Sequence, residues 1–272
     1  MNSYVKLLLL VAVAQQPGDG MSMRRIARLP FGPLFDPVVC CDSDHDSLPE
    51  LIFRAYYTPG PCRMEFWEHQ DWNRFRLVYA DTGAYPEPNG ITTGNAVPYD
   101  AGDVDGDGLT DIVCSNFEFF NPDSVRDITM TLESPDSHSY PSLLSWYYPG
   151  CMGVGLPPVY IRHDFEHDGH NVIFSSLEGK YSACIWRNAG NDSNEMVWRD
   201  STHLCGGYVA FRDFDGSGRS DVACGGFRAE VWEDTGNCQL ELVWEDTFDA
   251  GNGPDVWSTS DIDGSGQTRR KS

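Results

Sequence analysis

The sequence predicts an all-β fold built from repeated four-stranded units. Short runs of β-branched and aromatic residues recur along the chain, and turn-forming residues separate them, with 27 glycines and 17 prolines among 272 residues. No stretch longer than about 11 residues shows a helical period of apolar positions. An acidic loop recurs five times at similar spacings. This recurrence indicates one supersecondary unit copied along the chain.

The repeating unit starts with a short apolar run, continues through the acidic loop and ends in further strand patterns. The loops start at residues 42, 103, 164, 213 and 261, so successive starts are 61, 61, 49 and 48 residues apart. A buried-strand pattern such as Ile112-Val-Cys114 follows each of the first four loops, and two more strand patterns follow around a turn in the better units. Units of this length with four strands are typical of propeller blades. The predicted fold class is therefore a β-propeller of four-stranded blades with acidic loops, of which about four to five blades are present.

The second unit is long, and it contains several X-Pro steps between Asn116 and Pro158. These steps and a polar stretch over residues 133–140 are compatible with an extended loop inserted on one face, and equally with a longer hairpin.

The N-terminus predicts a secretory signal peptide over residues 1–14. Lys6 precedes the apolar run Leu7–Ala14, which ends in a small-x-small pattern before Gln15. The alternative for this run is a buried strand. Residues 15–37 are expected to form an N-terminal segment with a first strand, and residues 38–272 to form the repeats. The mature chain is expected to have no transmembrane segment and to be secreted, extracellular or at the cell surface, with the periplasm as an alternative.

The nine cysteines and the net charge narrow the function further. An odd number leaves at least one cysteine without an intrachain partner, and at most two or three disulfides are expected. Cys114 and Cys224 fall in apolar strand patterns, where cysteine serves as a small hydrophobe.

The formal charge of −22 argues against nucleic acid as a partner, because such binding needs clustered Lys and Arg. Sixteen of the 41 acids lie in the five loops.

The acidic loops have the composition of a site for a hard cation. Carboxylates at positions one, three, five and nine, a glycine at position six and a backbone carbonyl near position seven provide oxygen ligands around a tight turn. Ca²⁺ fits this flexible oxygen-rich arrangement better than Mg²⁺, and the loops mostly lack the Cys and His that Zn²⁺ prefers. An EF-hand is excluded, because its position-twelve glutamate and its flanking helices are both missing.

The five copies preserve the ligands to different degrees. The second is complete, with Asp103, Asp105, Asp107, the Leu109 carbonyl and Asp111. The first has Ser47 in place of the glycine and offers Asp42, Asp44, Asp46 and Glu50. The fourth is expected to bind more weakly, through Asp213, Asp215, Ser217 and Asp221. The third has lost a residue, so that Val172 falls at position nine, and retains Asp164, Glu166 and Asp168. The fifth has Arg269 at position nine and retains Asp261, Asp263 and Ser265.

At these residues the chain resembles the FG-GAP/VCBS repeat, the blade unit of integrin-α-type β-propellers and of bacterial-type secreted repeat proteins. Asp103 to Asp111 follows the pattern Asp-x-Asp-x-Asp-Gly-x-x-Asp throughout, and the resemblance extends from Val38 to the C-terminus. The resemblance implies a structural Ca²⁺ in each loop and ligand binding on the opposite face or the rim. It also implies a ring of seven blades, so the chain is expected to be part of a larger ring, with a compact ring of four or five blades as the alternative.

The leading functional hypothesis is a calcium-binding module for adhesion or for binding a protein or carbohydrate. The alternative is a propeller-based polysaccharide lyase or hydrolase, although no catalytic constellation is evident in the sequence. A third alternative is a structural segment of a larger surface protein. His163, His167 and His170 raise the further alternative of zinc near the third loop. The Trp146-Tyr-Tyr148 cluster could either stack on sugar rings or pack in the ordinary way.

Overall fold

The computed structural model describes residues 8–13, 22–28, 38–55, 62–71, 74–83, 93–121, 124–149, 160–161, 164–165, 171–177, 182–190, 192–200, 209–225 and 228–247. Within these ranges the regular structure consists of eighteen strands, and sixteen of them form four antiparallel four-stranded sheets. None of the described residues belongs to a helix that could cross a membrane. The prediction of an all-β fold made of four-stranded units is thus confirmed.

Each sheet is a meander in which strands adjacent in sequence are hydrogen-bonded neighbours. The first sheet contains β3 (Val39–Cys41), β4 (Glu50–Ala55), β5 (Arg63–Asp71) and β6 (Arg74–Asp81). The second contains β7 (Val97–Gly102), β8 (Asp111–Asn121), β9 (Ser124–Glu133) and β10 (Leu143–Pro149). The third contains β11 (Tyr160–Ile161), β12 (Val172–Leu177), β13 (Ser182–Asn188) and β14 (Asn194–Asp200). The fourth contains β15 (Val209–Arg212), β16 (Asp221–Gly225), β17 (Arg228–Gly236) and β18 (Gln239–Thr247).

The second unit is long because its strands β8 and β9 form an extended hairpin. Strands β8 and β9 pair from Asp111–Glu133 to Asn121–Ser124, and β10 then pairs with β9. The hairpin alternative is therefore the correct one as far as Pro149. Residues 150–158 lie outside the described part of the chain.

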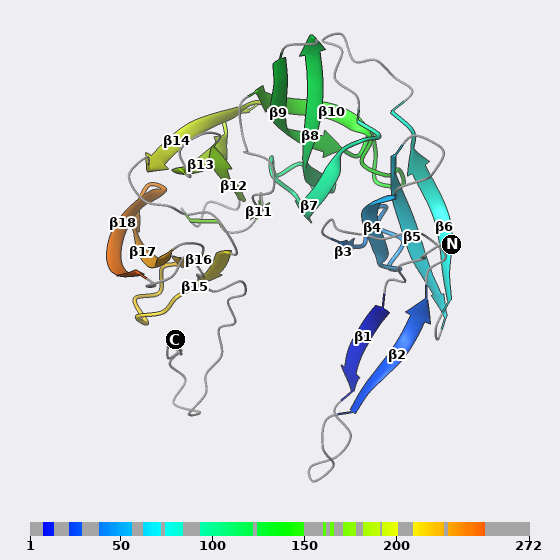
Figure 1. Cartoon of the computed structure of the whole chain (residues 1–272), viewed down its shortest axis with the longest axis horizontal. Helices are drawn as coiled ribbons and strands as arrows, with labels where there is room; N and C mark the ends of the chain where they lie inside the picture. The colour runs from blue at the N-terminus through cyan, green and yellow to red at the C-terminus, as the bar shows by residue number, and fades with distance from the viewer. Residues whose placement is uncertain are drawn as a thin grey trace.

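The N-terminal apolar run forms β1 (Leu8–Val13), which pairs with β2 (Ser22–Arg28) in a separate two-stranded hairpin. Figure 1 shows this hairpin, in dark blue, projecting from the end of the row of sheets. The proposed cleavage before Gln15 stays a prediction, since Gln15 and the end of the apolar run at Ala14 lie outside the described residues.

The four sheets follow one another along an arc, with the first strand of each sheet toward its inside (Figure 1). Strand β7 contacts β3, β4 and β11, and β14 contacts β18. The arrangement places consecutive sheets face to face, which is how apolar sheet faces are removed from water. Closure of these sheets into a propeller ring stays a prediction.

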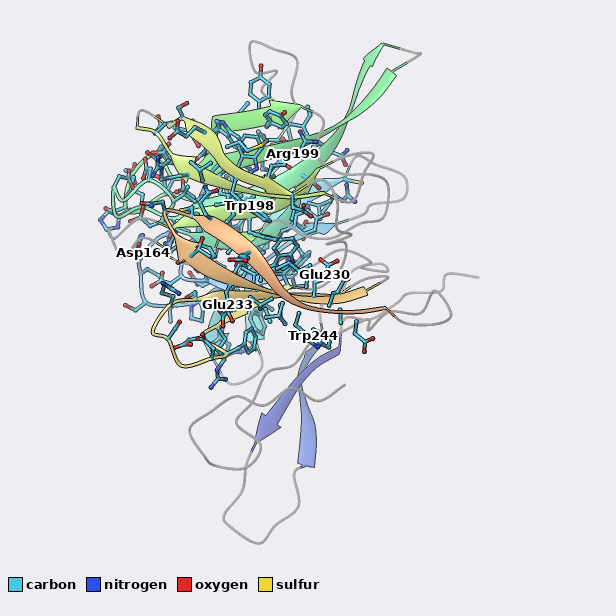
Figure 2. All side chains as sticks on the ribbon, turned by 90° about the vertical axis from the view of Figure 1, so that its left-hand side faces the viewer. Asp164, Trp198, Arg199, Glu230, Glu233 and Trp244 are labelled. Atoms are coloured by element: carbon cyan, nitrogen blue, oxygen red, sulfur yellow. The ribbon has the colours of Figure 1, made fainter. Side chains whose placement is uncertain are left out.

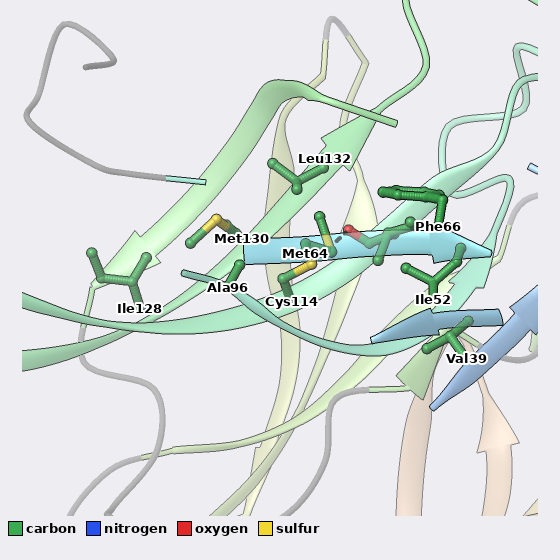
Figure 3. Packing of buried hydrophobic residues seen from close by; sticks show 10 residues of the cluster. Val39, Ile52, Met64, Phe66, Ala96, Cys114, Ile128, Met130 and Leu132 are labelled. Carbon is green, nitrogen blue, oxygen red and sulfur yellow. Dashed lines mark hydrogen bonds between the residues drawn. The ribbon is translucent and has the colours of Figure 1, made fainter. Parts of the chain in front are cut away.

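The core consists of apolar layers between consecutive sheets. Between the first and second sheets, fully buried Ile52, Met64 and Phe66 pack with Ile112 and Met130, as Figure 3 shows for part of this cluster. Two further clusters join the third sheet to its two neighbours, and a smaller one lies on the first sheet. Successive residues of a strand point to opposite faces of its sheet. In the second and third sheets both faces are covered by a neighbouring sheet.

The second and third sheets meet through aromatic side chains. The Trp186 ring lies 5.2 Å from the Trp146 ring and 4.5 Å from the Tyr148 ring, measured between centroids. Trp186 is 3% exposed. The cluster of Trp146 and Tyr148 is therefore used for packing between sheets, which leaves Tyr147 as its exposed member.

Two of the strand cysteines differ in their chemistry. Cys114 is buried as a free thiol, as expected for a small hydrophobe, and so is Cys184. Cys224 is also buried in its strand, but it is disulfide-bonded. A disulfide in the fourth sheet is compatible with an oxidising compartment.

Candidate cation-binding loops

Three acidic loops have a common structure, and each connects the first strand of a sheet to the second. The loop of residues 42–49 joins β3 to β4, residues 103–110 join β7 to β8, and residues 213–220 join β15 to β16. The ninth residue of each repeat (Glu50, Asp111 and Asp221) is the first residue of the second strand. This residue is therefore held by the sheet and oriented by strand pairing.

The carboxylates at positions one and nine organise the loop by accepting backbone hydrogen bonds. In the second loop, Asp111 accepts the Val104 N–H at 2.8 Å, and Asp103 accepts the N–H groups of Gly106 at 2.7 Å and Gly108 at 3.0 Å. The fourth loop repeats this pattern, with Asp221 accepting from Phe214 at 2.7 Å and Asp213 from Gly216 and Gly218 at 2.6 and 2.9 Å. In the first loop Glu50 accepts from both Ser43 N–H and Ser43 Oγ–H at 2.7 Å.

The loop turns at two residues with positive φ, at positions four and six. In the second and fourth loops both are glycines: Gly106, Gly108, Gly216 and Gly218 have φ between 80° and 87°. In the first loop the same conformation is adopted by His45 at 58° and Ser47 at 74°. The expected role of glycine at position six is confirmed, whereas position four was not recognised from the sequence. The paired glycines of Asp-Gly-Asp-Gly and Asp-Gly-Ser-Gly were the available signal.

The side chains at positions one, three and nine converge in all three loops. One carboxylate oxygen from each of Asp103, Asp105 and Asp111 lies within 4.8 Å of the other two. The same holds for Asp42, Asp44 and Glu50, and for Asp213, Asp215 and Asp221. Ca²⁺ binds oxygen at 2.3–2.6 Å, so two ligands of one ion lie no more than about 5 Å apart. These three groups therefore have the spacing that a single Ca²⁺ requires.

Burial of the ninth carboxylate is costly without a positive charge. Asp111 is 4% exposed, and burial together with the charges of Asp105, Glu133 and Asp103 raises its pKa to about 8. Burial likewise raises the pKa of Glu50 to about 7 and that of Asp221 to about 6. Desolvation and like charge both disfavour the ionised form. A bound cation reverses both effects by supplying the missing charge.

The first loop has two buried oxygen atoms whose hydrogen-bonding capacity is unused. Asp42 Oδ1 and Glu50 Oε1 have no hydrogen-bond partner among the described residues. Glu50 is fully buried, so its free oxygen also has no access to bulk water. A buried acceptor without a partner costs about 1–3 kcal/mol, and more when it is charged. A cation coordinated by Asp42, Asp44 and Glu50 would use these atoms, so the residues fit Ca²⁺.

The carboxylate at position five of the first two loops lies in a second group, which includes a glutamate from the third strand of the same sheet. Asp107 lies within 4.8 Å of Asp105 and Glu133, and Asp46 within 4.8 Å of Glu50 and Glu68. Glu68 and Glu133 are the cross-strand partners of Glu50 and Asp111. By the pairing register, Glu233 holds the same place in the fourth sheet (Figure 2). These third-strand acids were missed because they lie 12 to 22 residues beyond the ninth loop position, in ordinary strand patterns.

Most of the predicted ligands of the third and fifth loops lie outside the described residues. Asp164 is described, and β12 begins at Val172, so an apolar residue does occupy the ninth position of that unit. Glu166, Asp168 and the three neighbouring histidines lie outside the described residues. The whole fifth loop, with Asp261, Asp263 and Ser265, also lies outside them. Their ligand roles stay predictions, as does the role of the Leu109 carbonyl.

Comparison with known proteins identified no related sequence. No protein-family model matches the chain, and no curated protein matches it.

Backbone strain in the first loop gives a paired prediction. We expect Ser47→Gly to stabilise the protein by about 0.5–1 kcal/mol, because a left-handed conformation costs an L-residue about 1–2 kcal/mol and glycine returns part of this as unfolded-state entropy. Gly108→Ala is expected to have the opposite effect, and no atom lies near enough to obstruct the new Cβ. Urea unfolding curves measure both changes. If both variants changed the free energy of unfolding in the same direction, Ser47 would not be strained as proposed.

The buried acids predict a pH dependence for the metal-free protein. Because the folded-state pKa of Asp111 is raised to about 8 from 3.8, the folded chain binds the proton more tightly than the unfolded chain does. This contribution to stability is complete below about pH 4 and is lost as the pH rises toward 8. In EDTA, the melting temperature should therefore fall between pH 5 and pH 8, and Asp111→Asn should flatten that decline. Asp136→Asn is the control, because its exposed carboxyl has a lowered pKa and titrates below this window.

Proposed function

We propose that this protein is a calcium-stabilised β-propeller of the FG-GAP/VCBS type that is secreted or held at the cell surface. The observation that carries the proposal is the threefold repetition of one loop, with carboxylates at positions one, three and nine converging within 4.8 Å. Solvated acidic turns would have no reason to repeat the same hydrogen bonds and the same two positive φ angles. The unpartnered oxygens of Asp42 and Glu50 give further support.

The propeller arrangement is supported by the way the sheets pack. Four antiparallel meanders of four strands follow one another along an arc, and apolar layers fill the spaces between them. In this arrangement the acidic loops are hydrogen-bonded to the next sheet: Ser134 Oγ–H, in the turn between β9 and β10, donates to the Ser43 carbonyl at 3.4 Å, and Asn171 Nδ2–H donates to the Asp103 carbonyl at 2.8 Å. Calcium would thus stiffen one edge of every unit that keeps its ligands. The disulfide at Cys224 supports export.

The activity that follows from this proposal is binding of a protein or carbohydrate, with adhesion as the biological role. Every tight cluster of acids found among the described residues has an explanation as cation ligands. A lyase or hydrolase would need a further acid–base group in a cleft. Binding without turnover is therefore the function that the site favours.

Removal of calcium is the direct test of the metal. EDTA should lower the melting temperature by many degrees, because an ion that binds only the folded form contributes about 2.7 kcal/mol per site at a hundredfold excess over Kd. Asp103→Asn and Asp213→Asn should each reduce the gain from added Ca²⁺. Glu241→Gln, an exposed strand position with the same change of charge, should not. A melting temperature indifferent to EDTA would refute the calcium sites.

A glycan and extracellular-protein array, probed in Ca²⁺ and then in EDTA, tests the binding function. We expect retention of a ligand in Ca²⁺ and release in EDTA, since loss of the ions loosens the loops and the sheets behind them. Any polysaccharide retained should then be incubated with the protein and its chain length measured. Shortening of the polysaccharide would favour the lyase or hydrolase alternative over a binding module.

A further inference from the structure

A small polar cavity lies where the second and third sheets meet, beside the second acidic loop. Its volume is about 10 Å³, the space of a single water-sized sphere. The second sheet contributes Asp105, Asp111, Thr131 and Glu133, while the third contributes Asp192 from the turn between β13 and β14 and Asn194 from the start of β14. Such a cavity admits one small particle and excludes an organic ligand.

The charges around this cavity all have the same sign. Asp192, Asp105 and Asp107 are the charged groups that act on Glu133, and Asp192 also acts on Asp105. Oxygens of Asp105, Asp107 and Glu133 lie within 4.8 Å of one another. Water in the cavity could accept or donate hydrogen bonds, but it could not neutralise these carboxylates. A cation in the cavity would coordinate the oxygens and also neutralise the carboxylates.

Two neutral oxygens that border the cavity have no hydrogen-bond partner among the described residues. Thr131 is 3% exposed, and its Oγ1 atom is buried without a partner. Asn194 Oδ1, from the neighbouring sheet, is likewise a buried acceptor without one. A water or an ion is one way in which such buried polar atoms are satisfied. Carboxylate, amide and hydroxyl oxygens together form a ligand set typical of Ca²⁺.

We propose that this cavity binds a second Ca²⁺ ion, separate from the ion inside the loop, which bridges the second and third sheets. Its ligands are Glu133 and Asp105 from the second sheet, whose carboxylate oxygens converge, together with Thr131 Oγ1 and Asn194. The exposed carboxylate of Asp192 borders the same cavity from the third sheet and would complete the set. The site shares Asp105 with the proposed loop ion, whose ligand Asp111 also borders the cavity, and so rests in part on the proposed function. Its distinguishing ligands come from a third strand and from a neighbouring sheet.

The other sheet boundaries show why this one needs an ion. At the first boundary, the corresponding turn of the next sheet supplies Tyr140, whose hydroxyl hydrogen-bonds Asp44, the residue equivalent to Asp105. At the second boundary the turn supplies the acid Asp192 instead. Across the strands, Glu68 pairs with Arg76 at 3.1 Å, whereas the partner of Glu133 is Leu143. Among the described residues, the acids of the second sheet therefore have no counterpart of the Tyr140 hydroxyl or of the Arg76 guanidinium, which contact the acids of the first sheet.

Counting bound calcium tests the bridge. Equilibrium dialysis of the full-length protein should show one ion fewer for Glu133→Gln, and the same loss for Asp192→Asn. The matched control is Glu233→Gln, which makes the same change at the same register position of the fourth sheet, and should leave the count unchanged. Asp103→Asn tests the loop ion independently, because this residue does not border the cavity.

Melting curves provide a second measurement that also shows whether the variants fold. Glu133→Gln should melt higher than the unchanged protein in EDTA, because it relieves repulsion, and should gain less from added Ca²⁺. An unchanged ion count for Glu133→Gln, alongside a loss for Asp103→Asn, would overturn the bridge and leave the loop sites intact. Loss of an ion in Glu133→Gln but not in Asp192→Asn, or an equal loss in Glu233→Gln, would also overturn it, since the ion would then belong to one sheet alone.

Discussion

The buried carboxylate at the ninth loop position is the constraint on which the other features of the site depend. As the first residue of the second strand, it is held by sheet pairing, and its bond to the N–H at position two closes the loop over it, as Asp111 shows with Val104. Its burial makes its charge expensive, which the neighbouring acids aggravate. The loop therefore folds around a charge that needs a counter-ion, and the carboxylates at positions one and three are placed where they can share that ion.

The same constraint would link a cation bound in the loop to the sheets behind it. The ninth residue opens a strand whose next residues are core: Ile112 and Cys114 follow Asp111 and are fully buried between the first and second sheets. A cation that fixes Asp111 thereby fixes the start of β8 and the register of the pair β7–β8. Calcium in such a loop acts on the stability of the sheet as well as on the order of the turn, because neither can move without the other.

Much of the fold and of the loops could be predicted from the sequence, because both rest on local repetition. Period-two patterns and recurring turns gave the four-stranded units, and the spacing of Asp103, Asp105 and Asp111 gave a ligand group that does converge. Contacts set by strand pairing and sheet packing could not be predicted. Glu133 joins the site because it pairs across from Asp111, and Asp192 because the third sheet packs beside the second. Neither relation leaves a signal in the spacing of residues along the chain.

The third sheet shows what happens when the constraint is removed. Val172 replaces the buried acid at position nine, and its cross-strand partner is Arg187 where the other sheets have a glutamate. Arg187 in turn pairs with Glu195 at 3.0 Å, so the charge at this place is balanced within the sheet. An apolar residue and a surface ion pair need no cation, although such a pair contributes little by itself. The third unit has no buried acid at position nine for a cation to neutralise. Any dependence of stability on calcium should therefore be uneven along the chain, concentrated in the sheets that bury an acid at position nine.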